Sequence, residues 1–246
     1  MFRIIPDTLT EKEATMNFLY ISDVFCPWCY GFGKVMRRIT ADNPEIPVRT
    51  LCGLLMEEPM TTAEMVEEMP NVREFFDRLA STTGQEVGEA FLRQLGPEGD
   101  LRMDSGATSL PLRALKELAP GRALEQMEAF QQAFYGQGRD ILALETQIEL
   151  AARFGVGADD FRRALADAGV RAGALEEDKE AREIMGEFTL YPTLYLEKED
   201  GGRVLLARGY IPLKSVETAL SEAIGDKTPI LAQVPGAACF LNGNCG

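Results

Sequence analysis

The hydrophobic and polar positions near the N-terminus follow a strand pattern, then a helix pattern, then a strand pattern again. Residues 17–22 (NFLYIS) are rich in β-forming side chains and predict a buried strand. Residues 27–41 predict a helix with Pro27 at its first position, where the missing N–H of proline has no cost. Residues 46–52 (IPVRTLC) predict a second strand. Such a strand–helix–strand unit requires a parallel strand pair joined by a right-handed crossover.

From about residue 59 to residue 188 the hydrophobic pattern becomes helical. Thr61 and Glu64 have the spacing of a capping box, which marks the start of a helix. Residues 96–106 lack a periodic pattern and are expected to form a loop. Helices are expected over residues 62–69, 72–81, 85–95, 107–118, 121–136, 140–154, 158–168 and 173–187. So many helices cannot lie over a small sheet, so they are expected to form a lobe of their own.

The strand pattern returns after Pro192. Residues 193–198 and 203–208 predict two strands, and the intervening residues 199–202 (EDGG) predict a hairpin turn. A last helix is expected over about 212–224. The closing hairpin adds antiparallel strands to the parallel pair, so the sheet is expected to be mixed.

These blocks predict an α/β fold with a mixed sheet and a large all-helical insertion. Its strand–helix–strand and strand–strand–helix parts occupy residues 17–58 and 188–225. The helical insertion domain occupies residues 59–187, and residues 226–246 are expected to be an irregular C-terminal tail.

Composition and charge exclude several classes of function. The chain of 246 residues has 25 Lys and Arg against 39 Asp and Glu, a net charge of −14. Such a protein repels phosphate backbones and anionic lipids, so neither nucleic acid nor a membrane surface is expected as a partner. The first sixteen residues lack the apolar region of a secretory signal, so a cytoplasmic location is expected, with either Met1 or Met16 as the start.

The chain has no histidine, so His-based acid–base catalysis and His metal ligands are excluded. Its five cysteines are too few for a disulfide scaffold. They form a close pair (Cys26 and Cys29), a single residue (Cys52) and a terminal pair (Cys239 and Cys245).

The close pair lies where the first strand leads into the first helix. Cys26 is expected at the helix N-cap, where free backbone N–H groups and the helix dipole favour the thiolate. Such surroundings lower the pKa of Cys-x-x-Cys thiols to about 3.5–7.5. Cys29, one turn further along, is placed to resolve a mixed disulfide formed at Cys26. This chemistry needs no metal and no cofactor beyond the two sulfurs.

Two features leave alternatives open. Cys26 and Cys29 could instead join Cys239 and Cys245 in a zinc site, although the five-residue gap of the terminal pair is long for a zinc half-site. Tyr191-Pro192 precedes a strand, and a cis bond there would expose the Tyr191 backbone to an extended peptide. Local sequence alone favours the trans form.

Cys-Pro-Trp-Cys after a strand and Tyr-Pro-Thr before a strand hairpin together resemble the thioredoxin superfamily, which implies an α/β thioredoxin fold with a large all-helical insertion. The long helical block resembles the DsbA branch, and residues 23–31 (DVFCPWCYG) resemble the FrnE-like group of predicted protein-disulfide isomerases. The likeness covers about residues 17–224. It implies that Cys26 is the nucleophile, that Cys29 is the resolving thiol, and that Pro192 is a cis-proline facing them.

The resemblance also implies that Tyr191 and the helical insertion border the substrate groove. The spacer Pro27-Trp28 differs from the Pro-His of the best-known DsbA pattern, which argues against a strongly oxidising role. Protein thiols and disulfides or small thiols are the expected partners, with glutathione open as a co-substrate and a homodimer open as the assembly.

Several other residues have two interpretations. Cys239 and Cys245 either relay electrons to the Cys26–Cys29 pair, as FrnE-like proteins suggest, or form a permanent disulfide or inert thiols. Asp23 either assists proton transfer to Cys29 or is an ordinary polar residue at a strand end.

Cys52 is expected to be a small buried hydrophobe. Trp28 and Tyr30 either contact substrate or pack internally. A methionine-rich stretch is expected to be helix core rather than a peptide surface, and it comprises Met56, Met60, Met65 and Met69.

Two other functions remain open at this point. One is a glutathione-linked transferase or isomerase acting on a small molecule, by analogy with kappa-class glutathione transferases, which lack the cysteine pair. The other is a peptide-binding or chaperone module whose thiols are structural.

Overall fold

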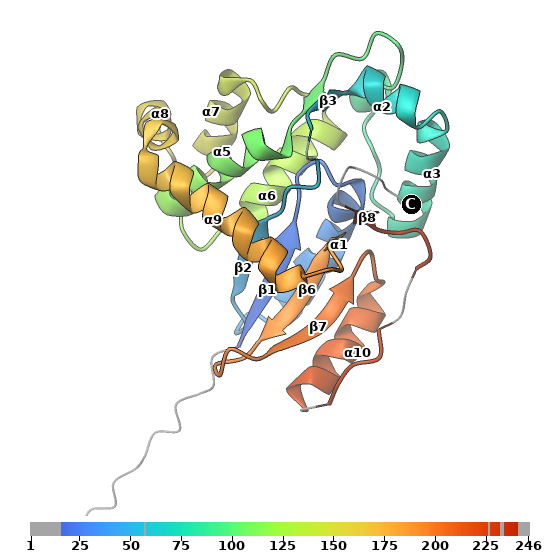
Figure 1. Ribbon diagram of the computed structural model, residues 1–246, viewed down its shortest axis with the longest axis vertical. Coiled ribbons are helices and arrows are strands. Elements are labelled where there is room, and N and C mark those ends of the chain that lie inside the picture. The colour runs from blue at the N-terminus through green and yellow to red at the C-terminus, as the bar shows by residue number, and fades with distance from the viewer. Residues whose placement is uncertain (1–15, 57, 226, 232–233, 241–246) are drawn as a thin grey trace, which may run out of the picture.

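A computed structural model describes residues 16–56, 58–225, 227–231 and 234–240 (Figure 1). Met1 and Cys245 lie outside these ranges. No helix within the described ranges is long and apolar enough to cross a membrane.

The central sheet is mixed, as predicted, with the strand order β2-β1-β6-β7. Its strands are β1 (Asn17–Ser22), β2 (Val48–Cys52), β6 (Thr193–Glu197) and β7 (Arg203–Arg208). β1 pairs in parallel with β2 and antiparallel with β6, and β6 pairs antiparallel with β7. The predicted hairpin turn is present, because the Lys198 N–H donates to the Gly202 carbonyl (2.8 Å) and Gly201 has φ +79°. Helix α1 (Pro27–Asp42) joins β1 to β2, and α10 (Leu213–Ile224) follows β7.

The segment between β2 and β6 is mainly helical, and its capping box is confirmed. The Thr61 hydroxyl accepts from the Glu64 N–H (3.2 Å), and the Glu64 carboxylate accepts from the Thr61 N–H (2.6 Å). The helices are α2 (Thr62–Glu68), α3 (Val72–Thr83), α4 (Glu89–Leu92), α5 (Ser105–Leu118), α6 (Ala123–Gln131), the π-helix η1 (Gln132–Gly136), α7 (Leu144–Ala152), α8 (Ala158–Ala166) and α9 (Ala168–Met185). The predicted loop over 96–106 also contains β4 (Arg102–Met103), which pairs with β3 (Met60–Thr61).

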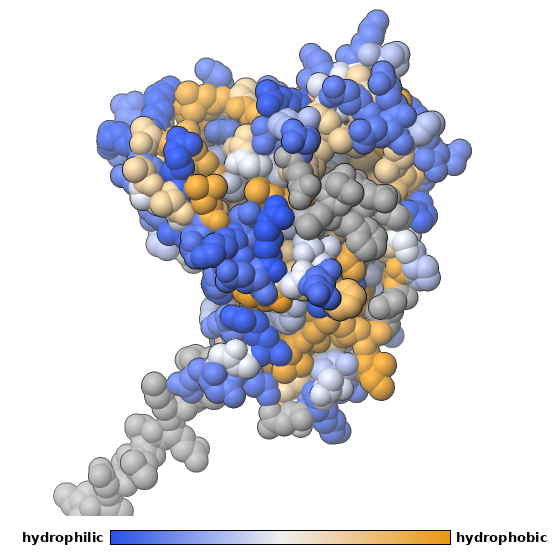
Figure 2. Space-filling model, in the orientation of Figure 1, coloured by the Kyte–Doolittle hydropathy of each residue, from blue (hydrophilic) through white to orange (hydrophobic). Residues whose placement is uncertain are grey.

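The helical insertion packs directly on the sheet instead of standing apart from it. One cluster of buried apolar side chains includes Phe18 and Leu196 of the sheet and Phe91 and Phe130 of the insertion. Helices α6 and α9 contact β2, and α9 crosses in front of the sheet in Figure 1. On the face shown in Figure 2, hydrophilic side chains dominate the insertion and an apolar band lies near α10.

A buried ion cluster fixes α5 and α9 to β2. The Glu177 carboxylate of α9 accepts from the Lys116 ammonium (2.5 Å) and from the Arg113 guanidinium (3.2 Å) of α5. Lys116 also donates to the carbonyl of Thr50 (2.9 Å) and lies 3.8 Å from the Cys52 sulfur. This network joins three elements far apart in sequence, so it sets how the insertion sits on the sheet.

The C-terminal tail was expected to be irregular, but part of it pairs with the chain before Pro192. Strand β8 (Cys239–Phe240) is antiparallel to β5 (Leu190–Tyr191), with Tyr191 opposite Cys239. The tail therefore crosses from α10 to the end of the sheet where α1 begins (Figure 1).

Candidate active site

The two cysteines of the close pair lie where the sequence places them, at the start of α1. Cys26 is the N-cap residue, Pro27 is the first helical residue, and the Cys29 N–H donates to the Cys26 sulfur (3.2 Å). Both thiols are free, and neither side chain is exposed to solvent. One turn of helix thus brings the two sulfurs to the same side of the helix start.

The predicted lowering of the Cys26 pKa is wrong for this form of the protein. Burial raises the pKa of the Cys26 thiol well above its ordinary value of 9.0, and the nearby Cys29 side chain raises it further. The helix-start amide of Cys29 lowers it, as expected, but is outweighed. The amide contact was predicted correctly from the sequence, whereas the desolvation of Cys26 was not.

The turn before Cys26 is held by the buried carboxylate of Asp23. One carboxylate oxygen accepts from the Phe25 N–H (2.7 Å) and the other from the Leu55 N–H (3.1 Å). The Asp23 carbonyl accepts from the Cys26 N–H (3.3 Å). Burial raises the pKa of Asp23 to about 6, although these N–H donors oppose the rise. Asp23 therefore stabilises the turn through its hydrogen bonds, and it is also a titratable group close to Cys26.

The helical insertion holds the same turn from the other side. The Gln131 side-chain amide donates to the Asp23 carbonyl (3.2 Å), and the Tyr135 hydroxyl donates to the Phe25 carbonyl (2.6 Å). Both residues are buried and lie where α6 passes into the π-helix η1. Neither residue could be predicted from the sequence, because a contact to a backbone carbonyl more than 100 residues away leaves no local pattern.

Tyr191 and Pro192 lie at the same end of the sheet as the cysteine pair, because Thr193 pairs with Ile21 near the end of β1. The peptide bond between Tyr191 and Pro192 is cis, and the Pro192 carbonyl accepts from the Gly209 N–H (2.8 Å). The Tyr191 ring lies against Gly53, where a Cβ atom would overlap it. Tyr191 is buried, and its hydroxyl has no hydrogen-bond partner in the described part of the chain.

The tail covers this edge. Besides the pairing of Tyr191 with Cys239, the Tyr210 N–H donates to the Ala237 carbonyl (2.6 Å). Arg78 of α3 donates to the Gly236 carbonyl (3.3 Å). Ala237 and Cys239 are both buried. The backbone beside the cis-proline, where an extended peptide would add as a strand, is thus already occupied by the protein's own tail.

Trp28 and Tyr30 are both buried and therefore pack internally in this form. The Trp28 ring lies 5.8 Å from the Phe75 ring and under the Arg78 guanidinium (5.6 Å). Tyr30 stacks on Tyr135 (5.0 Å, 25°).

Met56 is buried in the main apolar cluster, and Met60, Met65 and Met69 are partly buried against it, which supports a core role; Met60 lies in β3 rather than in a helix. Cys52 is buried as predicted, and burial raises its pKa to about 12.

Cys239 is disulfide-bonded, whereas Cys26, Cys29 and Cys52 are free. A sulfur in a disulfide cannot serve as a thiolate ligand, which counts against the zinc alternative. Within the described ranges there is no group of three or more Cys, Asp or Glu placed to hold a metal ion.

The described geometry can perform dithiol–disulfide exchange. The Cys26 sulfur lies at a helix start and accepts a hydrogen bond from the Cys29 N–H, and Cys29 lies within the same turn.

Comparison with known proteins places this site in context. The profile of the DSBA-like thioredoxin domain matches residues 20–186. No match was found among curated proteins.

Solved structures with the same fold include a protein of Nitrosomonas europaea provisionally assigned as a protein disulfide isomerase. It has 21% identity and a TM-score of 0.74, covering 86% of this chain and 98% of that one. The cytosolic disulfide reductase DsbM of Pseudomonas aeruginosa has 24% identity and a TM-score of 0.66, covering 85% of this chain and 98% of that one. DsbM has also been solved with GSH. A Streptomyces coelicolor protein provisionally assigned as a DsbA oxidoreductase has 21% identity and a TM-score of 0.63, covering 91% and 98%.

Proposed function

This chain belongs to the family of DSBA-like thioredoxin domains, and we propose that it exchanges dithiols and disulfides through Cys26 and Cys29. The observation that carries the proposal is the hydrogen bond from the Cys29 N–H to the Cys26 sulfur at the first turn of α1. That amide stabilises negative charge on the Cys26 sulfur, both when it attacks and when it leaves. Family membership supports the same chemistry.

The proposed reaction has two steps. The Cys26 thiolate attacks one sulfur of a substrate disulfide, so that a mixed disulfide forms and one substrate thiolate leaves. The Cys29 thiolate then attacks the Cys26 sulfur, which releases the second substrate thiolate and leaves a Cys26–Cys29 disulfide. Two electrons have passed to the substrate, and a small thiol such as glutathione would restore the dithiol. The reverse order oxidises a substrate dithiol.

We propose reduction or isomerisation in the cytoplasm as the working direction. The Pro27-Trp28 spacer supplies no charge beside the Cys26 sulfur, and the cytosol keeps thiols reduced. A structural neighbour is named as a cytosolic disulfide reductase, which is compatible with this direction.

We further propose that the tail must leave the β5 edge before substrate binds. An incoming peptide would pair with Tyr191, which now pairs with Cys239. We also propose that Cys239 and Cys245 form an auxiliary redox pair. A disulfide at Cys239 would then exchange with Cys26 and Cys29 and so carry electrons between the tail and the active site.

Trapping tests the exchange mechanism. In Cys29→Ser the mixed disulfide cannot be resolved, so purification from the host should yield partners attached to Cys26, identified by mass spectrometry. The matched control Cys26→Ser should retain none. If mild oxidation of the wild-type protein forms no Cys26–Cys29 disulfide, the proposal fails. Full activity of Cys29→Ser with strict glutathione dependence would instead favour a glutathione-linked transferase.

A further inference from the structure

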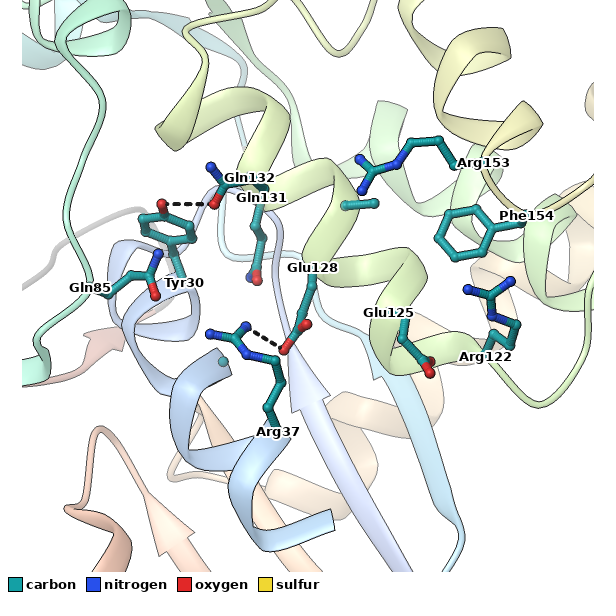
Figure 3. Close-up of a pocket in the computed structure, with 12 residues that line it drawn as sticks. Tyr30, Arg37, Gln85, Arg122, Glu125, Glu128, Gln131, Gln132, Arg153 and Phe154 are labelled. Carbon is teal, nitrogen blue, oxygen red and sulfur yellow. Dashed lines mark hydrogen bonds and ion pairs between the residues drawn. The ribbon is translucent and has the colours of Figure 1, made fainter. Parts of the chain in front are cut away.

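A cavity of about 480 Å³ lies behind α1, between that helix and the helical insertion (Figure 3). Its volume is within the range of about 300–1,000 Å³ typical of small-molecule sites. None of the residues lining it is a cysteine, and the proposed exchange reaction does not use it. Its lining is mostly charged or amide-bearing, which is unusual for a simple packing defect.

One end of the cavity carries two arginines that have no acidic partner. Arg122 precedes α6 and lies over the Phe154 ring (4.7 Å), and Arg153 follows α7. Neither guanidinium forms an ion pair with any carboxylate in the described part of the chain, although the protein has 39 acidic residues. The contact with Phe154 holds the Arg122 guanidinium at the cavity, where its N–H groups can donate to a planar carboxylate.

The remaining charges of the lining are one ion pair and one unpaired carboxylate. Arg37 of α1 pairs with Glu128 of α6 (3.0 Å), so these two charges compensate each other. Glu125 has no cationic partner in the described ranges, and its charge raises the pKa of Glu128, adding to the larger effect of burial. Two positive charges and one negative charge are therefore left to be matched by a ligand.

The opposite end of the cavity offers neutral hydrogen-bonding groups. The Tyr30 hydroxyl donates to Gln132 (3.2 Å), and Gln85 lies beside it. The Gln85 side-chain oxygen is buried and has no hydrogen-bond partner in the described structure. A buried acceptor of this kind costs free energy until a donor reaches it, so a ligand N–H at this end would be favoured.

We propose that this cavity binds a small zwitterion with two carboxylates and one ammonium group, the chemistry of an acidic amino acid or a γ-glutamyl peptide. The carboxylates pair with Arg122 and Arg153, and the ammonium group pairs with Glu125. An N–H donor of a longer ligand reaches Gln85. The charge of such a ligand, −1, neutralises the unpaired charge of the lining.

Calorimetric titration tests the proposal with two probes that cannot exchange thiols, L-glutamate and S-methylglutathione. We expect a dissociation constant below about 1 mM for at least one probe. Arg122→Gln with Arg153→Gln should weaken binding at least tenfold, which is about 1.4 kcal/mol. Both arginines are exposed, so the double substitution should leave the fold intact.

The matched control is Arg162→Gln with Arg163→Gln, which removes the same charge from α8, where these residues pair with Asp159 and Asp160. It should bind as the wild type does. Glutarate, which lacks the ammonium group, should bind the wild type more weakly than L-glutamate does. The two ligands should bind Glu125→Gln equally well. The proposal is overturned if neither probe binds at about 10 mM, or if the cavity variant binds as tightly as the control. Neither result bears on exchange at Cys26.

Discussion

Removal of the tail should convert Cys26 from a protected thiol into a reactive thiolate. In the covered form, burial keeps the Cys26 pKa above 9.0, so the thiolate fraction at pH 7 is below about 1%. We predict that removal of the tail relieves the desolvation of Cys26, while the Cys29 amide and the dipole of α1 remain. Thiols at such helix starts have pKa values of about 3.5–7.5, which gives a thiolate fraction of at least about 24%. A chain ending at Gly225 should therefore alkylate at Cys26 at least about 25-fold faster at pH 7.

The assay is alkylation by iodoacetamide between pH 5 and pH 9, with the modified peptides quantified by mass spectrometry. Cys52 is an internal control, because its thiol is buried between β2 and the insertion and should stay unreactive in both chains. Reaction at Cys52 would show that the truncated chain has unfolded. Ala237→Asp, which places a charge at a buried tail position, then opens the tail in the full-length chain. An unchanged rate and pH profile at Cys26 in both proteins would refute the protective role of the tail.

Three further changes test the supports of the site through the free energy of unfolding in urea. Burial raises the pKa of Asp23 from 3.8 to about 6, so between these pH values the folded state holds a proton that the unfolded state has lost. The free energy of unfolding of the wild type should therefore fall by about 3 kcal/mol as the pH rises through this range. Asp23→Asn should lack that fall, and an identical pH slope would contradict the assignment. Gly53→Ala should cost about 1–3 kcal/mol because its methyl group overlaps the Tyr191 ring, whereas Gly96→Ala, in open space, should cost far less; equal losses would argue against the overlap. Glu177→Gln should cost about 3 kcal/mol by leaving the half-buried Lys116 ammonium without its carboxylate, and a loss below about 0.5 kcal/mol would mean that the cluster is solvated.

The parts of the fold that sequence predicted are those specified by local pattern. β1, the start of α1 at Pro27 and the turn at Gly201 each follow from neighbouring residues, and each lies where expected. The capping box of Thr61 and Glu64 is likewise complete within four residues.

The parts that sequence could not predict depend on distant contacts. β8 has two residues and pairs with a strand 49 positions earlier, so it has no periodicity of its own. The sign of the Cys26 pKa shift failed for a related reason: the amide that lowers the pKa is three residues away, whereas the burial that raises it depends on the packing of the whole site.

The hydrogen bonds from Gln131 and Tyr135 to backbone carbonyls have an evolutionary consequence. A carbonyl oxygen is the same for every amino acid, so these hydrogen bonds survive substitution of the residues that precede Cys26. Homologues can therefore vary this stretch and keep its shape, while a change at position 131 or 135 alters the shape without touching the motif. Divergence in redox behaviour between relatives should be sought in the insertion helices as much as in the residues between the two cysteines.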